Sequence, residues 1–465
     1  MFPRHLSLPP LTRWVLATVV GAFVIFNANF RELGLADTIP ATLLAANIVR
    51  HGDLTLDAFE PMLDERAPDG FVTLRKQFEW TLAARRVRGH LRSSYPVGPA
   101  ILASPVYVAP VVFDMLHGFH DYRVVGKLAA SLIAAISAAF VFLSLLRFCG
   151  RTSALLLTVV YALGTSVWSI ASQALWQHGP ALLCLSLALW AALRLREHDR
   201  AGDAVLVSIG AGMAVVCRPQ DAIGSLSIGL FALVSRPRRA PFLVLPAALI
   251  GALLAVYNVH AFGNVSGGYE DLYASPAHAF RHITPENAFT LPLAEGLSGL
   301  LVSPSRGLFV YSPVLAVAFG ALAITALAKE ELLARTLLVW VVVTLCLWAK
   351  FRLWWAGTSY GPRYLTELAL PLVLGLGMAI HRIRAHAVLS VAVVALSVFG
   401  IGVQALGAAT WECGWHYTPG WVHYGLERLW DYKDPEILRC ARVFVEQGPK
   451  PADFGPLAPG SPAPR

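Results

Sequence analysis

The sequence predicts an all-α protein that crosses a membrane many times. Of its 465 residues, 56% are hydrophobic and only 14% are charged, and the mean hydropathy is +0.58. A soluble domain carries about 25% charged residues. Continuous apolar runs recur along most of the chain, and several approach the ~20 residues that a helix needs to cross the hydrocarbon core. The runs do not alternate in polarity, which argues against a transmembrane barrel.

The apolar runs place about eleven spans along the chain. They cover residues 13–30, 124–146, 152–172, 177–195, 203–217, 220–235, 240–262, 307–327, 332–349, 364–381 and 387–409. A further run, 96–117, contains four prolines. Because proline removes helical hydrogen bonds, this run is not expected to form a regular spanning helix. We expect it to lie on the outer face of the membrane or to dip into it.

The distribution of basic residues supports this assignment of 96–117. If that run does not cross, the short loops "RFCGR", "RLREHDRAGD", "SRPRRA", "AKEELLAR" and "HRIRAH" all fall inside, as the positive-inside rule requires. The long loops 31–123 and 263–306 and the tail from 410 then lie outside. We therefore expect the polar chemistry of the chain to be concentrated on the extracytoplasmic side, such as a periplasm.

The chain divides into a transmembrane region, 1–409, and two tail segments. Residues 410–446 are rich in Trp and Tyr, which favour the membrane interface. Residues 447–465 are rich in proline and are predicted to be disordered. The first tail segment holds Cys413 and Cys440, and the sequence leaves open whether they form a disulfide in an oxidising compartment.

Composition and motifs argue against several function classes. The net charge of +8 and the pI near 9.3 fit membrane topology and anionic lipid, and no nucleic-acid motif accompanies them. No CxxC or His/Cys pattern predicts a metal site. The inside loops contain no glycine-rich phosphate loop or nucleotide fingerprint. A cytosolic reaction driven by ATP or a nucleotide sugar is therefore not expected.

The stretch "ADTIPATLLAANIVRHGDLTLD", 36–57, follows the first span. It predicts a helix that lies on the outer face of the membrane that the chain crosses. Its apolar residues recur at helical spacing, Pro40 suits a first turn, and Gly52 suits the end. Asp37 at the helix start fits an N-cap, with Thr38 as the alternative cap, and it also fits a general base that the helix holds in place. Asp53 and Asp57 fit solvated loop charges better than catalytic groups.

Two later segments each bring an arginine to the outer entry of a span. Arg306 lies in "SPSRGLFVYSP", and Arg363 lies in "GTSYGPRYL" between Tyr360 and Tyr364. Such an arginine can simply extend to the interface. Since Gly, Ser and Tyr surround both, and arginine grips phosphate in a fork geometry, we predict a cradle for a lipid phosphate. Lys127, near the outer end of the second span, is a further candidate for that phosphate.

Other polar residues at outer span ends are candidates for substrate contacts. Tyr95 would form a wall of the site. Gln177 and His178 stand at a span entry, where His178 fits an interfacial hydrogen-bonded group and a site residue equally well. Arg218 is a candidate, although it can simply pair with Asp221. Trp168 and Trp176 are interpreted as interface residues.

The stretch 36–57 resembles the first-loop signature of GT-C-fold glycosyltransferases. These include the polyprenyl- or dolichyl-phosphate-mannose protein mannosyltransferases and the lipid A aminoarabinose transferase. "SSYPVGPAILASPVY", 93–107, is similar to the juxtamembrane segment that follows in those enzymes, and "WWAGTSYGPRYL" is similar to segments of bacterial members. The resemblance implies a GT-C bundle with extracytoplasmic juxtamembrane helices.

The resemblance also implies a reaction. The donor would be a sugar on a polyprenyl phosphate, the acceptor an extracytoplasmic lipid, glycan or protein, and Asp37 the base in an inverting displacement. The second acid of the family is replaced here by Gln177 and His178. Where the family often has Asp-Glu, this chain has Asp37-Thr38, which weakens the case for the divalent cation that some members bind. No cofactor is assigned, and a divalent cation is left open.

Two other functions stay open. A lipid-linked-sugar flippase would share the phosphate cradle and need no base, although charged groups within the spans are sparse and no inverted repeat is evident. A membrane scaffold would explain neither the arginines at the span entries nor the clustering of polar residues outside.

Overall fold

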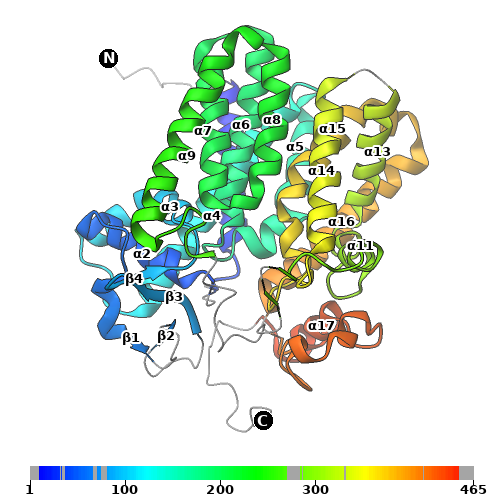
Figure 1. Cartoon of the computed structure of the whole chain (residues 1–465). Coiled ribbons are helices and arrows are strands. Elements are labelled where there is room, and N and C mark those ends of the chain that lie inside the picture. Colours follow the sequence, from blue (N-terminus) through cyan, green and yellow to red (C-terminus); the bar gives the residue numbers. More distant parts are fainter. Residues whose placement is uncertain are drawn as a thin grey trace, which may run out of the picture.

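A computed structural model describes residues 10–31, 33, 37–65, 71–74, 81–269, 283–284, 286–328, 331–411 and 413–449. It shows a bundle of long helices with smaller elements gathered at one end (Figure 1). The bundle consists of α1 (Pro10–Asn27), α4 (Phe119–Leu145), α5 (Arg151–Leu163), α6 (His178–His198), α7 (Ala201–Cys217), α8 (Ala222–Ser235), α9 (Ala240–Phe262), α13 (Val314–Ala328), α14 (Leu332–Lys350), α15 (Ala369–Ala385) and α16 (Ala387–Thr410). The predicted all-α class is confirmed.

Each expected span contains one of these helices, but they differ in length. Among the described residues, six helices are long and apolar enough to cross a membrane: 119–145, 178–198, 237–262, 332–350, 363–385 and 387–410. The expected span 152–172 is not one helix, because α5 ends at Leu163 and a separate π-helical turn, Val167–Ala171, follows. Such turns interrupt the regular backbone ladder and are frequent at functional sites.

Helix α9 shows how the bundle meets its surroundings. It is apolar on all sides, and Leu245, Leu249 and Val256 are each more than 60% exposed. A helix that is apolar all round has no face suited to water. These side chains therefore face lipid, while the other side of α9 packs on α7.

Two juxtamembrane helices lie at the lower end of the bundle in Figure 1. They are α2 (Ile39–His51) and α3 (Gly98–Val112), which pack on each other. Helix α3 has 15 residues, with Pro105 and Pro110 inside it. A helix thus forms within 96–117 at this end of the bundle, and that it does not cross the membrane remains a prediction.

A small antiparallel sheet in the first long loop was not expected from the sequence. Its strands are β1 (Leu63–Glu65), β2 (Phe71–Leu74), β3 (Thr81–Val87) and β4 (His90–Ser93), in that order. Arg88 and Gly89 both have positive φ, 51° and 83°, between the paired residues Val87 and His90. This is the two-residue turn that suits the twist of a hairpin. The Arg-Gly pair was the local signal, although Asn-Gly or Asp-Gly signals such a turn more strongly.

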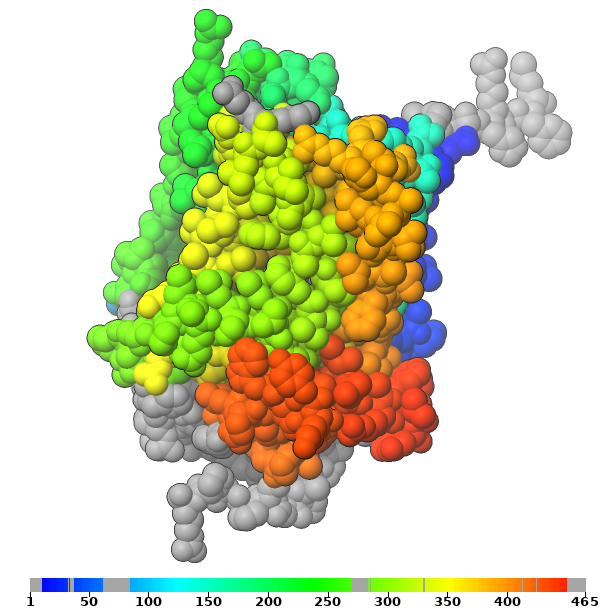
Figure 2. Space-filling view, turned by 90° about the vertical axis from the view of Figure 1, so that its right-hand side faces the viewer, coloured from blue at the N-terminus to red at the C-terminus, as the bar shows by residue number. Residues whose placement is uncertain are grey.

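The C-terminal part also lies at this lower end. Helix α17 (Glu436–Gln447) packs against α16, and Cys413 and Cys440 form a disulfide. Figure 2 shows this segment, in orange-red to red, below the end of α16 and beside α11 (Leu293–Val302). Most of the predicted disordered tail, 450–465, lies outside the described residues.

The basic short loops lie at the opposite end of the bundle. The connections α6–α7 and α8–α9 are at the top of Figure 1, whereas α2, α3, the sheet and α17 are at the bottom. The described parts of the loops 31–123 and 263–306 and of the tail from 410 therefore share one end, as the distribution of charge predicted. That this end faces the periplasm remains a prediction.

Candidate functional site

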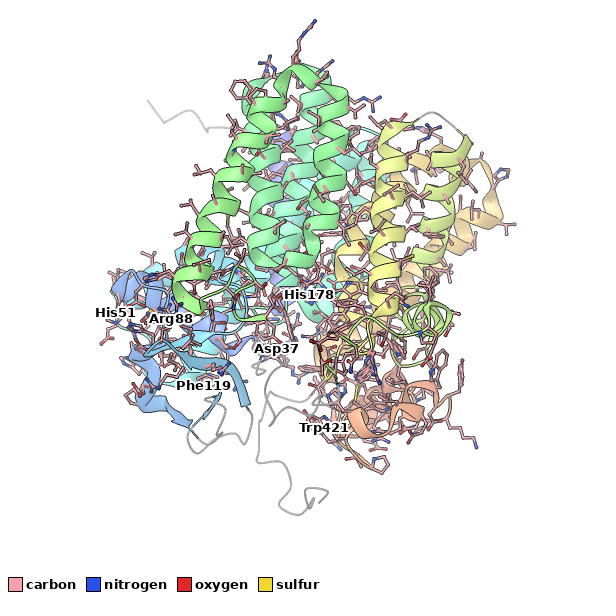
Figure 3. The ribbon with its side chains drawn as sticks, viewed as in Figure 1. Asp37, His51, Arg88, Phe119, His178 and Trp421 are labelled. Atoms are coloured by element: carbon pink, nitrogen blue, oxygen red, sulfur yellow. A yellow bond between two sulfur atoms is a disulfide. The ribbon has the colours of Figure 1, made fainter. Side chains whose placement is uncertain are left out.

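An arginine and a carboxylate from opposite halves of the chain meet at the lower end of the bundle. Arg363 donates from Nη1 to Asp37 Oδ2 at 2.8 Å, across 326 residues of sequence. The Asp37 side chain is 29% exposed and that of Arg363 is 11% exposed. Two candidates that the sequence placed in separate segments thus lie in contact, at an accessible position. Figure 3 shows Asp37 near His178, between the first-loop elements and the C-terminal segment that carries Trp421.

The local backbone explains the position of Asp37. It directly precedes Thr38, the N-cap residue of α2, and the Thr38 carbonyl accepts from the Thr42 amide at 3.1 Å. The Thr38 side chain makes no cap hydrogen bond, and the Asp37 carboxylate is directed to Arg363. Thr38 thus occupies the expected N-cap position, but the expected capping bond from its side chain is wrong. Pro40 is in the first turn, and Gly52 ends α2 with φ of 71°, as predicted.

Aromatic rings surround Arg363. Its guanidinium lies 4.4 Å from the centroid of the Trp176 ring and 5.7 Å from that of Tyr364. The Tyr364 ring stacks on Trp348 with centroids 4.1 Å apart. A cation over an aromatic face is attracted by the ring quadrupole, and more strongly when water is excluded. Trp176, interpreted from the sequence as an interface residue, is instead 4% exposed and lies within this site.

Two tyrosines extend the site toward α2. The Tyr95 and Tyr269 rings meet edge to face with centroids 6.2 Å apart, and the Tyr269 hydroxyl donates to Gln177 Oε1 at 2.7 Å. Burial raises the pKa of the Tyr95 phenol well above its ordinary value, and the Asp37 carboxylate raises it further. Both effects keep the phenol protonated, so Tyr95 can donate a hydrogen bond next to Asp37.

A buried ion cluster adjoins this pair on its bundle side. Arg218 donates from Nη1 to Glu367 Oε2 at 2.5 Å and to Asp221 Oδ1 at 3.4 Å. The other Glu367 oxygen lies 2.7 Å from His178 Nδ1. All four side chains are at most 6% exposed. Arg218 does contact Asp221, as the sequence suggested, but Glu367 is its closer partner.

Glu367 was missed by sequence analysis. It lies in the short 3-10 helix η5 (Arg363–Leu368), one turn after Arg363. The signal available was an acidic residue in an apolar run, which usually marks a functional position. By binding Arg218 and His178, Glu367 fixes η5 to the bundle, and so it fixes the segment from which Arg363 extends.

The structure separates Arg306 from this site. Its side chain is 1% exposed, and Nη1 pairs with Glu436 Oε2 at 2.7 Å. Its Nε donates to the Trp355 carbonyl at 2.9 Å, and its guanidinium lies 5.1 Å from the Trp415 ring centroid. A phosphate has no access to this saturated, buried group. The prediction that Arg306 binds the donor phosphate is therefore wrong.

Lys127 and Tyr360 are also placed inside the protein. Lys127 is 4% exposed and donates to the Phe26 carbonyl at 2.8 Å and to Gln173 Oε1 at 2.6 Å. Tyr360 is fully buried, and its hydroxyl donates to the Val403 carbonyl at 2.9 Å. Lys127 thus connects α4 to the end of α1. Tyr360 packs the segment just before η5 against α16. Neither side chain is therefore placed to contact the donor phosphate or the substrate.

Asp53 and Asp57 serve the loop that follows α2. Asp53 Oδ1 accepts from the Asn47 amide at 2.6 Å and from the Thr55 backbone at 2.8 Å. Asp57 pairs with His90 at 2.7 Å and accepts from the Leu91 amide at 2.6 Å. These contacts agree with their interpretation as loop charges.

The described residues around Asp37 do not form a site for a divalent cation. Among the described residues, no group of three or more His, Cys, Asp or Glu is arranged to hold a metal. The nearest charged partner of Asp37 is the guanidinium of Arg363, which repels a cation and occupies one carboxylate oxygen. We assign no step of the reaction to a metal.

Comparison with known proteins gives a partial match. The family model of the dolichyl-phosphate-mannose-protein mannosyltransferases matches residues 87–261, from the end of β3 to the end of α9. No curated protein matches the sequence.

Two solved structures of the oligosaccharyltransferase of Archaeoglobus fulgidus are similar to this chain. The enzyme AglB in complex with an inhibitory peptide and a dolichol-phosphate is 12% identical, with a TM-score of 0.46, over 85% of this chain and 55% of that one. The apo form is 13% identical, with a TM-score of 0.45, over 91% and 60%. The chain thus spans less than two thirds of the length of the archaeal enzyme. The family match confirms the predicted resemblance to the dolichyl-phosphate-mannose protein mannosyltransferases, and over residues 87–261 the chain is similar to that family.

Proposed function

We propose that this protein transfers a sugar from a polyprenyl-phosphate donor to an acceptor on the outer side of the bacterial inner membrane. The observation that carries the proposal is the pair of Asp37 and Arg363, which joins a base to a phosphate-binding group at one accessible place. The match of residues 87–261 to a family named for a dolichyl-phosphate-linked sugar supports the donor class.

In the proposed reaction, an acceptor hydroxyl attacks C1 of the sugar while the bond between C1 and the phosphate oxygen breaks. The hydroxyl proton passes to the Asp37 carboxylate. The sugar carries oxocarbenium character in the transition state. The electron pair of the broken bond leaves with the phosphate, whose charge Arg363 stabilises. A single displacement inverts the configuration at C1.

The geometry around Asp37 suits this role. Among the described contacts, Arg363 binds Oδ2, so Oδ1 is available to accept the hydroxyl proton. Arg363 orients the carboxylate through this bond. Tyr95 and Tyr364 lie beside the pair, and their hydroxyls can bind sugar hydroxyls. Gln177, which accepts from Tyr269, is a further candidate for such a contact.

The decisive experiment is reconstitution of the full-length protein in vesicles with a radiolabelled polyprenyl-phosphate sugar and an envelope extract as acceptor source. We expect the label to appear in a product that no longer contains polyprenyl phosphate. Translocation of intact donor across the vesicle without transfer would identify a flippase and refute the proposal. Absence of both would refute it as well. Mass spectrometry of the labelled product would then identify the sugar and the acceptor.

A further inference from the structure

Glu436, at the start of α17, connects the C-terminal segment to the bundle. Its carboxylate is fully buried. Oε2 accepts from Arg306 Nη1 at 2.7 Å, from the Tyr311 hydroxyl at 2.8 Å and from the Gly361 amide at 3.1 Å, and Oε1 lies 3.0 Å from His416 Nε2. Burial alone would raise the pKa of Glu436, but Arg306 and His416 lower it below its ordinary value. The carboxylate is therefore an ionised acceptor on which several elements converge.

Arg306 extends this connection to the turn that holds Arg363. Its Nε donates to the Trp355 carbonyl at 2.9 Å and its Nη2 to the Gly357 carbonyl at 3.3 Å. Between them lies Ala356, whose carbonyl accepts from Arg363 Nη2 at 2.9 Å. Ala356 has φ of 61°, a conformation that costs free energy in a non-glycine residue and persists only when its surroundings impose it. Arg306 holds the carbonyls on both sides of this residue.

The C-terminal segment also contacts the turn directly. The Trp355 indole donates to His423 Nδ1 at 3.1 Å. Gly357 has φ of 70°, and a Cβ there would lie 3.6 Å from the His423 ring and 4.0 Å from Arg363 Nη2. His423 and the guanidinium of Arg363 therefore border the same small volume.

The disulfide closes this segment. Cys440 is four residues after Glu436 in α17, so both lie on one face of the helix, and both are fully buried. The bond to Cys413 ties that face to the end of α16. Figure 2 shows the segment seated as a unit under the bundle. Glu436 thus lies about one helical turn from the disulfide that ties α17 to the end of α16.

We propose that the disulfide-closed segment 413–440 is a clamp that positions Arg363 by holding the 355–357 turn, with Glu436 and Arg306 as positioning residues. The effect of the clamp on the turn stands independently of the reaction. Its effect on donor binding rests on the proposed function.

Hydrogen exchange of the full-length protein tests the first part. We expect amides of the 353–363 loop to exchange about tenfold faster in Glu436→Gln, because the loop loses a charged anchor, while amides in the middle of α4 and α6 are unchanged. Glu427→Gln, an exposed carboxylate of the same segment, is the matched control. Unchanged exchange in 353–363 would overturn the clamp.

Mild reduction of the folded wild type provides the same test without a substitution. Faster exchange in 353–363 after the Cys413–Cys440 bond is reduced supports the clamp, with Cys346→Ser, which removes a free cysteine, treated in parallel. An increase that extends equally through α4 and α6 would show general unfolding and would contradict a local role.

Donor kinetics test the second part. If the clamp orients Arg363, Glu436→Gln raises KM for the polyprenyl-phosphate sugar, and the inhibition constant of polyprenyl phosphate itself, by about tenfold. A role confined to folding would lower kcat at constant KM, since only the active fraction would fall, and would overturn this part. If the wild type itself transfers no sugar, the proposed function fails, and the exchange measurements alone decide the clamp.

Discussion

Two arginine–carboxylate pairs lie at the same end of this bundle and differ in what surrounds them. Arg363 and Asp37 are 2.8 Å apart, with side chains 11% and 29% exposed. Arg306 and Glu436 are 2.7 Å apart, with side chains 1% and 0% exposed. Among the described contacts, the first pair uses only Oδ2 of Asp37, whereas in the second pair Oε2 of Glu436 also accepts from other protein donors. The two pairs have nearly the same bond length. They differ in the exposure of their side chains and in the number of hydrogen bonds that each carboxylate already accepts.

The difference assigns the two pairs distinct tasks. An accessible pair with aromatic walls can exchange its internal bond for bonds to a ligand. A buried pair whose members already bind several protein groups cannot do so without leaving a buried charge unpaired, which is strongly unfavourable. The first pair is thus suited to chemistry and the second to holding backbone in place. Substitutions in each pair should therefore change different measured quantities.

The largest effect is expected from Asp37→Asn. The amide keeps the shape of the carboxylate but cannot take a proton, so we expect transfer to fall by about 10²–10⁴-fold. The melting temperature should change little, because the residue is accessible and its bond to Arg363 is partly exposed. The measurement is the rate at which the purified, folded variant transfers a labelled sugar. Transfer near the wild-type rate would refute the role of Asp37 as base.

Arg363→Lys should have the next largest effect. Lysine keeps the positive charge but cannot bond Asp37, the Ala356 carbonyl and a phosphate in the fork geometry of arginine. We expect kcat/KM for the donor to fall by about 10–100-fold, mostly through KM. The same variant should be inhibited more weakly by polyprenyl phosphate. Unchanged donor kinetics would place the phosphate elsewhere.

These two pairs also show how far the sequence could lead. "SPSRGLFVYSP" and "GTSYGPRYL" look alike, and both predict an arginine at an outer span entry. The fold class, the helices and the positions of Asp37 and Arg363 followed from hydropathy, charge and short motifs. What separates Arg306 from Arg363 is Glu436, which lies 130 residues away in the tail. No local pattern carries that pairing.

The same limit explains why Glu367 and Trp176 were missed. Glu367 was hidden in an apolar run that was assigned to a span, and its partners Arg218 and His178 come from two other helix ends. Trp176 matched the general preference of tryptophan for the interface, whereas tertiary packing places its ring under Arg363. Residues whose role depends on contacts between distant helices could not be predicted from periodicity.

Arg306→Met should mainly change stability. Methionine fills part of the volume but leaves the buried Glu436 carboxylate without its strongest partner, and removal of one member of a buried pair costs about 3–5 kcal/mol. We expect a lower melting temperature in detergent. The matched comparison is Arg86→Met in the first loop, whose pair with Glu60 is exposed and should contribute about 0–1 kcal/mol. Equal melting temperatures for the two variants would contradict the distinction between the pairs.

The smallest effect on transfer is expected from Asp53→Asn. This variant tests whether the loss of any acidic residue in the first loop lowers transfer. Asp53 lies just after α2, but its Oδ1 is occupied by Asn47 and Thr55. Asparagine retains an oxygen that can accept these bonds, so stability should fall by only about 0.5–1.5 kcal/mol. Transfer should stay within about threefold of wild type, since the side chain reaches no reacting group in the proposed mechanism. A loss as large as that of Asp37→Asn would show that transfer depends on the loop as a whole, and the singular role proposed for Asp37 would have to be abandoned.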